Sequence, residues 1–330
     1  MPLISVIVPI YKTEPFVEKC LRSIMAQTLQ AIEILCVDDC SPDDSAQIVE
    51  TLAGEDDRIR LIRHDRNLGL GGARNTGIAA ARAPFLASVD SDDYILPEMM
   101  ERLWAGTDDQ AADIVVCGMT MVDNAGITMV DNAGKTLLKI SPKPGRHLNN
   151  QDQMDIFKIF NPSFCNKLWR RSLFTDHGIR FPERTYYEDL ATTPRVLRHA
   201  TDIRVIPDNL YRYVYRDSSI TNTTSEKHIV DYFKCYNILQ SFLLSEELME
   251  RYRQEFAGAI GRSLFYHSKS VVTSSISEDE KAEYLRHMLM LKIGFLEHGE
   301  RLGALSTAEL QELIQNATCH GDLRKSEHAF

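Results

Sequence analysis

The chain has 330 residues, of which 44% are hydrophobic and 25% are charged, and its formal net charge is −10. This composition is ordinary for a globular protein with a substantial core, and the length suits one large domain or two smaller ones. An acidic chain lacks the basic face that nucleic acid requires and has no polybasic signal for anionic membranes, so neither is expected as a major partner.

No window approaches about 18 uninterrupted apolar residues, so the sequence predicts no transmembrane helix. The first residues, MPLISVIVPIYK, lack a basic segment and a small-residue cleavage site, and we interpret them as a strand. The seven cysteines are scattered and contain no C-x-x-C. This pattern favours reduced thiols and a cytoplasmic location over a disulfide framework or a zinc site.

The first hundred residues alternate between continuous apolar runs and segments with apolar residues at helical spacing. The apolar runs predict strands at 4–11, 32–39, 58–65 and 83–90. The segments between them predict helices at 14–28, 41–55 and 71–83. Strands that alternate with helices indicate βαβ units, and therefore an α/β fold with a mostly parallel sheet.

Acidic residues follow these predicted strands. The second strand ends in Asp38 and Asp39, and the fourth ends in the run Asp90, Ser91, Asp92, Asp93. Because parallel strands end at the same edge of a sheet, and ligands bind outside that edge, we expect these acids to converge there. An aspartate is also a good helix N-cap, but one cap needs only one carboxylate. The cluster therefore indicates a binding site.

Strands and helices alternate less regularly in the second part of the chain. Residues 113–122 and 202–216 read as strands, and 151–160, 166–178 and 186–200 read as helices. Residues 120–127 and 128–135 are a tandem duplication of TMVDNAG, which we interpret as a lengthened hairpin or loop. From about residue 226 the pattern is helical, which predicts an appended helical segment.

Carboxylates spaced D-x-D suit a hard divalent cation. Mg²⁺ and Mn²⁺ prefer oxygen ligands, usually one or two protein carboxylates together with phosphate oxygens. The three acids Asp90, Asp92 and Asp93 are therefore candidate metal ligands, and the metal would hold a diphosphate. Such a cation acts as a Lewis acid on a departing phosphate.

Three other motifs each allow two interpretations. The glycine-rich stretch 66–77 is either a turn that brings Arg74 near a nucleotide or close packing of a helix on the sheet. In YYED, Glu188 and Asp189 either cap a helix or supply a general base. In YRYVYRDSSITN, Arg212 and Arg216 either reach a diphosphate or lie on the surface of an ordinary strand.

In this order and spacing, SVIVPIYK, VDDCSPDDS, NLGLGGARNTGI, DSDD and YYED resemble the bacterial family-2 glycosyltransferases with the GT-A fold. The resemblance covers roughly residues 2–222, and NKLWRRSLF with YRYVYRDSSITN is similar to the subset that builds capsules, exopolysaccharides and lipopolysaccharide. It implies a metal-dependent, inverting transfer from a nucleotide-diphosphate sugar, usually a UDP-sugar, to a saccharide or lipid-linked acceptor.

The resemblance also implies roles for individual residues. The nucleotide-sugar would be held by Pro9, Tyr11, Asp38, Asp39, Arg74, Asp90, Ser91 and Lys167, with Asp39 meeting the base. A Mn²⁺ or Mg²⁺ ion would be bound among Asp90, Asp92 and Asp93, and the sequence leaves open which two bind it. Asp189 would be the base beside Glu188, and Arg216 would neutralise the departing diphosphate. Lys12 departs from the family pattern, which often has Asn there.

The expected organisation is a GT-A domain at 1–225, with a nucleotide-sugar half at 1–105 and an acceptor half at 106–225, followed by a helical extension at 226–330. The extension is compatible with a homodimer or with peripheral contact to the inner face of a membrane. A non-catalytic subunit that binds nucleotide-sugar is the alternative function. A nucleotidyltransferase is disfavoured because no glycine-rich loop follows the first strand.

Overall fold

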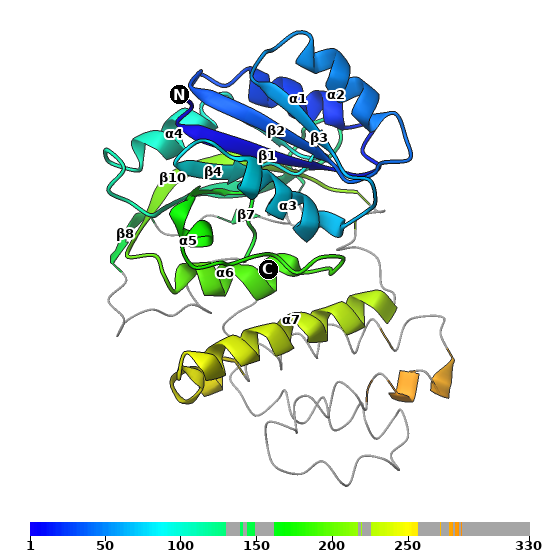
Figure 1. The fold of residues 1–330 in the computed structure, drawn as a ribbon, viewed down its shortest axis with the longest axis vertical. Helices are drawn as coiled ribbons and strands as arrows, with labels where there is room; N and C mark the ends of the chain where they lie inside the picture. Colours follow the sequence, from blue (N-terminus) through cyan, green and yellow to red (C-terminus); the bar gives the residue numbers. More distant parts are fainter. Residues whose placement is uncertain are drawn as a thin grey trace. The chain divides into compact units, whose positions relative to one another are not determined.

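The computed structural model describes residues 1–129, 139–140, 144–148, 162–216, 219, 226–256, 271, 277–279, 281–283 and 285. The chain divides into two compact units, Met1–Asp217 and Ser218–Phe330. The first unit contains the sheet and its flanking helices (Figure 1).

The strands of the first unit are β1 (Ile4–Ile10), β2 (Ile32–Asp38), β3 (Ile59–Arg63), β4 (Phe85–Ser88), β5 (Tyr94–Ile95), β6 (Ile114–Val122), β7 (Lys139–Ile140), β8 (Gly145–Leu148), β9 (Lys167–Arg170) and β10 (Asp202–Val214). Its helices are α1 (Val17–Met25), α2 (Ser45–Ala53), α3 (Gly69–Ala80), α4 (Met99–Ala105), α5 (Ser172–Thr175) and α6 (Glu188–Leu197). The four strands and three helices predicted in the first hundred residues are confirmed, and Gly54 is the C-cap of α2.

The strands form one sheet in the order β3-β2-β1-β4-β9-β6-β10-β5, with β7 paired to β6 and β8 to β10. Strands β3, β2, β1 and β4 are mutually parallel, and β6 is parallel to β10. Strand β9 runs antiparallel between β4 and β6. The predicted α/β class with a mostly parallel sheet is therefore confirmed, with antiparallel strands inserted in its second half.

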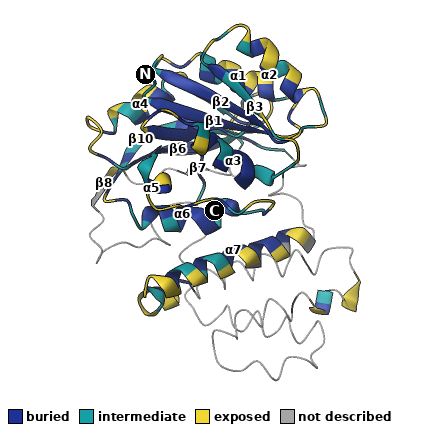
Figure 2. Cartoon of the chain, viewed as in Figure 1, coloured by how far each residue is buried: buried dark blue, intermediate teal, exposed yellow. Residues whose placement is uncertain are grey.

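Helices cover both faces of the first half of the sheet, which explains why every residue of β1 and β2 is buried and why most of them are apolar. Alternate β1 residues share one cluster with the apolar faces of α1, α2 and α4. Helix α3 lies against the other face, where Gly77 approaches β1 so closely that an added Cβ would lie 2.5 Å from Ile7 Cγ2. Figure 2 shows the strands buried and the outer faces of α1 and α2 exposed.

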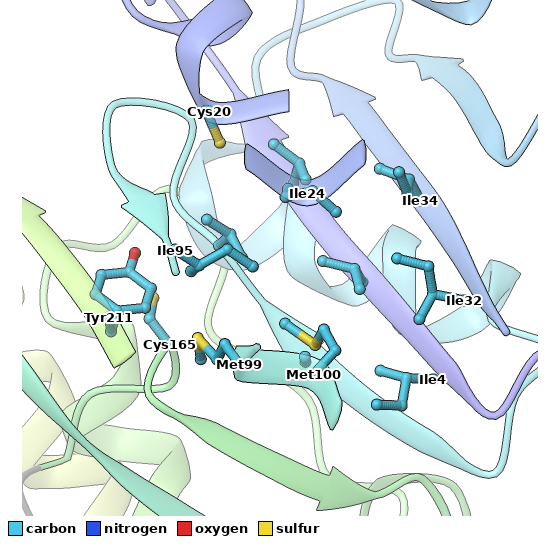
Figure 3. Close-up of a cluster of buried hydrophobic side chains, with 14 of the residues drawn as sticks. Ile4, Cys20, Ile24, Ile32, Ile34, Ile95, Met99, Met100, Cys165 and Tyr211 are labelled. Atoms are coloured by element: carbon cyan, nitrogen blue, oxygen red, sulfur yellow. The ribbon is translucent and has the colours of Figure 1, made fainter. Parts of the chain in front are cut away.

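One core cluster of buried residues extends from the β1–β2 region to the end of β10. It joins Ile4, Ile24 and Ile34 at one side to Ile95, Cys165 and Tyr211 at the other, as Figure 3 shows. The core thus reaches directly beneath the acidic loop that follows β4.

One predicted helix is wrong in its first part. The segment 166–178 was expected to be helical, but Lys167–Arg170 forms β9, and only the short α5 follows it. The strand pairs with β4 and β6 on its two sides, and Leu168 and Trp169 are fully buried there. Tertiary pairing overrides the local helical pattern in this segment.

The tandem duplication begins inside β6. Its first copy completes the strand and then turns, because the N–H of Gly126 donates to the carbonyl of Asp123 and Val122 bridges to Thr128. Residues 130–135 of the second copy lie outside the described residues, as does the predicted helix at 151–160.

In the second unit, α7 (Glu226–Ser245) begins at the residue where the helical tail was predicted. Its Tyr232 and Tyr236 hydroxyls are 2.9 Å apart, and the Tyr236 ring packs edge-on to Phe256. Most of the predicted tail beyond 256 lies outside the described residues. In the part of the chain that is described, no helix is long and apolar enough to cross a membrane.

Candidate active site

The carboxyl ends of β1, β2 and β4 lie at one edge of the sheet, as the sequence predicted. In the parallel register Ile10 is opposite Asp38, and the N–H of Asp39 donates to the carbonyl of Ile10 at 2.9 Å. The N–H of Val89 donates to the carbonyl of Ile7 at 3.0 Å, which continues the β4 alignment. Residues 90–93 therefore leave the sheet beside the ends of β1 and β2.

The three acids of the loop between β4 and β5 are placed differently. Asp90 and Asp92 are partly open to solvent, with side chains 29% and 21% exposed, whereas Asp93 is buried. Ser91, between them, is also buried. The loop is closed as a turn by the N–H of Asp93, which donates to the carbonyl of Asp90 at 2.9 Å.

Asp93 points into the protein and is held by uncharged donors. The Tyr211 hydroxyl donates to its Oδ2 at 2.7 Å, and the N–H of Val214 donates to its Oδ1 at 2.8 Å. Burial raises the pKa of Asp93 well above its usual value, and the neighbouring Asp90 carboxylate raises it further. This carboxylate therefore ties the acidic loop to the end of β10.

Arg74 lies at the centre of the cluster, with a side chain only 2% exposed. Its Nη2 donates to Asp90 Oδ1 at 2.9 Å, and its Nη1 donates to Glu188 Oε1. Its guanidinium carbon lies 5.5 and 5.6 Å from the ring centres of Phe164 and Phe181. Burial alone lowers the pKa of Arg74, but the carboxylates of Asp90 and Glu188 raise it above its usual value.

Arg74 thereby brings the YYED motif to the acidic loop. Glu188 and Asp189 open α6, with the preceding Tyr187 in the left-handed region at φ 59°. Burial raises the pKa of Glu188 to about 7, and burial also raises that of Asp189. Asp189 is only half-buried, and the backbone N–H of Leu190 donates to its Oδ1 at 2.8 Å. The two acids thus combine elevated pKa values with a position beside the binding edge, which suits a general base.

Arg216 follows the end of β10 and forms an ion pair with Asp92. Its guanidinium carbon lies 4.9 Å from the centre of the Phe16 ring, and burial lowers its pKa. The second arginine of that motif, Arg212, instead donates to the carbonyl of Asn209 at 2.9 Å, in its own strand. Of the two arginines, the structure brings Arg216 to the acidic loop.

Lys167 is fully buried at the start of β9. Its ammonium donates to the carbonyl of Ser163 at 2.6 Å and to Asn166 Oδ1 at 2.7 Å. Burial lowers the pKa of Lys167 to about 8.

At the end of β2, Asp38 accepts from the N–H of Ser41 at 3.1 Å. The Asp39 carboxylate accepts from the backbone N–H groups of Leu68 and Gly69, both at 2.7 Å, and lies 2.7 Å from His64 Nδ1. It therefore holds the β3–α3 loop, and its predicted contact with a nucleotide base stays a prediction.

The end of β1 carries the remaining nucleotide candidates. Pro9 lies within β1, opposite Val37, and Tyr11 beyond it is 43% exposed. Lys12 has a positive φ of 55°, and its ammonium lies 5.3 Å from the Tyr11 ring centre.

The glycine-rich stretch serves close packing in this structure. An added Cβ at Gly71 would lie 2.3 Å from the carbonyl oxygen of Pro182, and Gly69 has a positive φ of 76°. Asn75 on the same helix exchanges hydrogen bonds of 2.9 Å in both directions with the backbone of Phe181. These contacts hold the segment before α6 against α3, and so they place Glu188 beside Arg74.

The acids suit a divalent cation in ligand type, because carboxylate oxygens are the donors that Mn²⁺ and Mg²⁺ prefer. Among the described residues, no group of three His, Cys, Asp or Glu side chains is arranged to hold a metal by itself. Asp92 and Asp90 are the partly exposed carboxylates of the loop, and a cation bound there would need further oxygen ligands. A diphosphate supplies such ligands, so the residues fit a metal that arrives with a nucleotide.

Several residues of the cluster were not predicted from the sequence. Tyr211 joins Asp93 to the backbone of Asp90, and the Cys165 thiol donates to Asp90 Oδ2 at 3.1 Å. His64 links Asp39 to the hydroxyl of Thr76, at 2.7 and 2.8 Å. Tyr211 opens the YRYVYRDSSITN motif, in which only the arginines had been given a role, whereas Cys165 and His64 belong to no motif that the sequence indicated as functional.

Comparison with known proteins identifies the family of the chain. A family model described as "Glycosyl transferase family 2" matches residues 5–178. EpsJ of Bacillus subtilis, named as an uncharacterized glycosyltransferase, is 36% identical over 222 residues, which are 67% of this chain and 63% of EpsJ. The succinoglycan biosynthesis protein ExoO of Rhizobium meliloti is 30% identical over 230 residues, 69% of this chain and 65% of ExoO. The chain thus spans slightly less than two thirds of each of these relatives.

The fold is also that of a solved structure. The crystal structure of S. aureus TarS 1–349 in complex with UDP-GlcNAc superimposes with a TM-score of 0.71 at 24% identity, covering 97% of this chain and 88% of TarS 1–349. This likeness shows that the α/β sheet with flanking helices is the GT-A fold. With the family match over more than half of the chain, it follows that the protein belongs to glycosyltransferase family 2.

Proposed function

We propose that the protein is a metal-dependent, inverting glycosyltransferase that moves a sugar from a nucleotide-diphosphate sugar to a hydroxyl group of a saccharide or lipid-linked acceptor. The observation that carries the proposal is the buried Arg74, which joins Asp90 of the acidic loop to Glu188 of the YYED motif. This contact supports the proposal because it brings the acidic loop, the proposed diphosphate site, together with a candidate base.

Asp189 is the proposed base. The acceptor hydroxyl oxygen forms a bond to the anomeric carbon of the donor sugar while the bond from that carbon to the diphosphate oxygen breaks. The hydroxyl proton passes to the Asp189 carboxylate, and attack from the face opposite the diphosphate inverts the anomeric carbon. The elevated pKa of Asp189 makes its carboxylate a better proton acceptor than an ordinary one.

The diphosphate leaves with negative charge, which cationic groups at the edge of the sheet stabilise. Arg216 is the proposed partner of that charge, and it exchanges Asp92 for the diphosphate when the donor binds. Lys167 is buried beside the cluster and keeps its proton at neutral pH. Its positive charge therefore also helps to stabilise the negative charge on the departing diphosphate.

Asp92 and Asp90 are the residues that would hold a Mn²⁺ or Mg²⁺ ion together with the donor. When bound, the ion supplies Lewis-acid stabilisation of the departing diphosphate. The names of relatives support a UDP-sugar donor and a polysaccharide product, since TarS was crystallised with UDP-GlcNAc and ExoO is named for succinoglycan biosynthesis.

The donor is tested by a thermal-shift screen of UDP, GDP, dTDP and CMP sugars, each with and without Mn²⁺. We expect a UDP-sugar to raise the unfolding temperature in the presence of Mn²⁺, because a ligand that binds only the folded state stabilises it. Replacement of Asp92 by Ala removes that shift. If no nucleotide-sugar stabilises the chain, the proposal is wrong.

The chemistry is tested by Asp189→Asn, which keeps the shape of the side chain and removes the base. Donor binding by isothermal titration should be unchanged, while transfer falls by roughly 10²–10⁴-fold. Normal transfer by this variant would show that Asp189 is not the base. Binding of UDP by the unmodified chain, with neither transfer nor hydrolysis on any acceptor, would instead favour a non-catalytic subunit.

A further inference from the structure

Asp93 and Tyr211 form a buried contact to which the proposed chemistry assigns no step. The contact is a relay of two hydrogen bonds in series. The N–H of Asp90 donates to the Tyr211 hydroxyl oxygen at 3.2 Å, and the hydroxyl proton in turn is donated to Asp93 Oδ2 at 2.7 Å. Because the backbone N–H of Asp90 can only donate, the Tyr211 oxygen accepts from it, and the hydroxyl proton is left for Asp93.

The other carboxylate oxygen of Asp93 is used as well. It accepts from the backbone N–H of Val214 at 2.8 Å, three residues beyond Tyr211 on β10. Asp93 thus fastens two points of one strand end to the loop that carries Asp90 and Asp92.

The two groups on either side of this contact are those that the proposed function assigns to the diphosphate. Asp92 is the residue before Asp93, and Arg216 lies two residues beyond Val214. A strand end fixed at Val214 limits where the backbone of Arg216 lies relative to the acidic loop, and the Arg216 side chain pairs there with Asp92.

We propose that Asp93 and Tyr211 are positioning residues that set the separation between Asp92 and Arg216, and that Asp93 does not bind the metal. This inference rests on the proposed function, since it assigns Asp92 and Arg216 to the diphosphate. It follows from burial: the Asp93 carboxylate lies inside the protein, where Tyr211 and the Val214 N–H donate to it, whereas Asp90 and Asp92 are the acids of the loop that are partly exposed.

The chain offers a matched control at the opposite edge of the sheet. There the N–H of Ala83 donates to the Ser5 hydroxyl at 3.1 Å, and that hydroxyl donates to the buried carboxylate of Glu33 at 2.6 Å. The chemistry of this relay is the same, but Ser5 lies at the amino end of β1, away from the acidic loop.

The test compares Tyr211→Phe with Ser5→Ala. Each variant loses one buried hydroxyl relay, so both should lower the unfolding temperature by a few degrees. Only Tyr211→Phe should lower kcat, by roughly tenfold to a hundredfold, with a donor KM changed by less than about threefold, because misplaced groups lose catalysis more than binding. An equal kcat in Tyr211→Phe and Ser5→Ala would overturn the proposal.

The second arm separates a positioning role from metal ligation. Asp93→Asn should retain Mn²⁺-dependent UDP binding, measured by titration, whereas Asp92→Asn should lose it. The double variant Asp93→Asn with Tyr211→Phe should lose little more kcat than either single variant, since both remove one contact. Loss of Mn²⁺-dependent binding in Asp93→Asn would make Asp93 a ligand and overturn the proposal.

A third readout does not depend on activity, so it separates failure of this inference from failure of the proposed function. Amide hydrogen exchange should accelerate at residues 90–95 and 214–216 in Tyr211→Phe and remain unchanged there in Ser5→Ala. If the unmodified chain transfers no sugar, the proposed function fails while this readout still decides the contact. Unchanged exchange at residues 90–95 in Tyr211→Phe would overturn the inference by itself.

Discussion

The two edges of the sheet use carboxylates in opposite ways. At the amino edge, Glu33 accepts from the Ser5 hydroxyl and from both the N–H and the side chain of Arg82. Burial alone would raise the pKa of Glu33, but these hydrogen bonds lower it below its usual value. Asp113, before β6, behaves alike, because donors from Thr201 and Arg170 outweigh its burial and lower its pKa.

At the carboxyl edge the balance is reversed. Burial dominates at Asp93, Glu188 and Asp189, and the pKa of each is raised. Acids of the first kind stabilise the fold, whereas acids of the second kind cost stability and are typical of sites that take up a proton or a cation. The role of an acid, structural or functional, is therefore indicated by the hydrogen-bond donors around it, and less by the number of acids at the same edge.

The largest effect should come from the buried cation of the carboxyl edge. Replacement of Arg74 by Met leaves Asp90 and Glu188 without their partner and should lower the free energy of unfolding by about 3–5 kcal/mol, as removal of one member of a buried ion pair does. The control is Arg82→Met at the amino edge, whose side chain is 63% exposed and should cost below about 1 kcal/mol. Urea unfolding measures both, and equal losses would contradict the asymmetry.

A smaller effect is expected when the amino-edge acid itself is changed. Glu33→Gln keeps one acceptor for Ser5 but removes the charge that Arg82 and Arg60 face, and should lower the free energy of unfolding by about 1–3 kcal/mol. Because Glu33 lies at the edge away from the acidic loop, kcat of the folded variant should equal that of the unmodified chain. A large loss of kcat would show that the two edges are not independent.

The pH dependence of stability should separate the edges. The lowered pKa of Glu33 means that the unfolded chain takes up this proton first, so its stabilisation is complete above about pH 4 and is lost as the pH falls through the folded value. For Glu188, raised to about 7, the folded chain takes up the proton first, and stability falls as the pH rises from about 4 to about 7. The free energy of unfolding, measured from pH 3 to 8, should depend less on pH at the acidic end in Glu33→Gln. It should depend less on pH near neutrality in Glu188→Gln.

The smallest effect concerns the rate profile. A base acts only when deprotonated, so transfer should fall as the pH drops through the raised pKa of the Glu188–Asp189 pair. Glu188→Gln removes a negative neighbour and leaves Arg74 to Asp189, which should move the acid limb of kcat to lower pH, by about one unit or less. An acid limb of kcat that stays at the same pH, or moves to higher pH, would show that the protonation of Glu188 does not affect the pKa of Asp189.

The sequence by itself determined the first half of the fold and the edge of the sheet at which the candidate site lies. Apolar runs and helical spacing are local signals, and parallel strands necessarily end at one edge, so the convergence of Asp38, Asp39 and the 90–93 loop followed from the chain order. Only the tertiary structure decided what each acid does. Residues 167–170 form a strand because two neighbouring strands bury them. Asp93 receives a hydrogen bond from Tyr211, which is 118 residues away in the sequence, and Arg74 reaches Glu188, which is 114 residues away. Burial and hydrogen-bond donors, which set the state of a carboxylate, come from residues that are distant in the sequence and are not encoded in the local pattern around it.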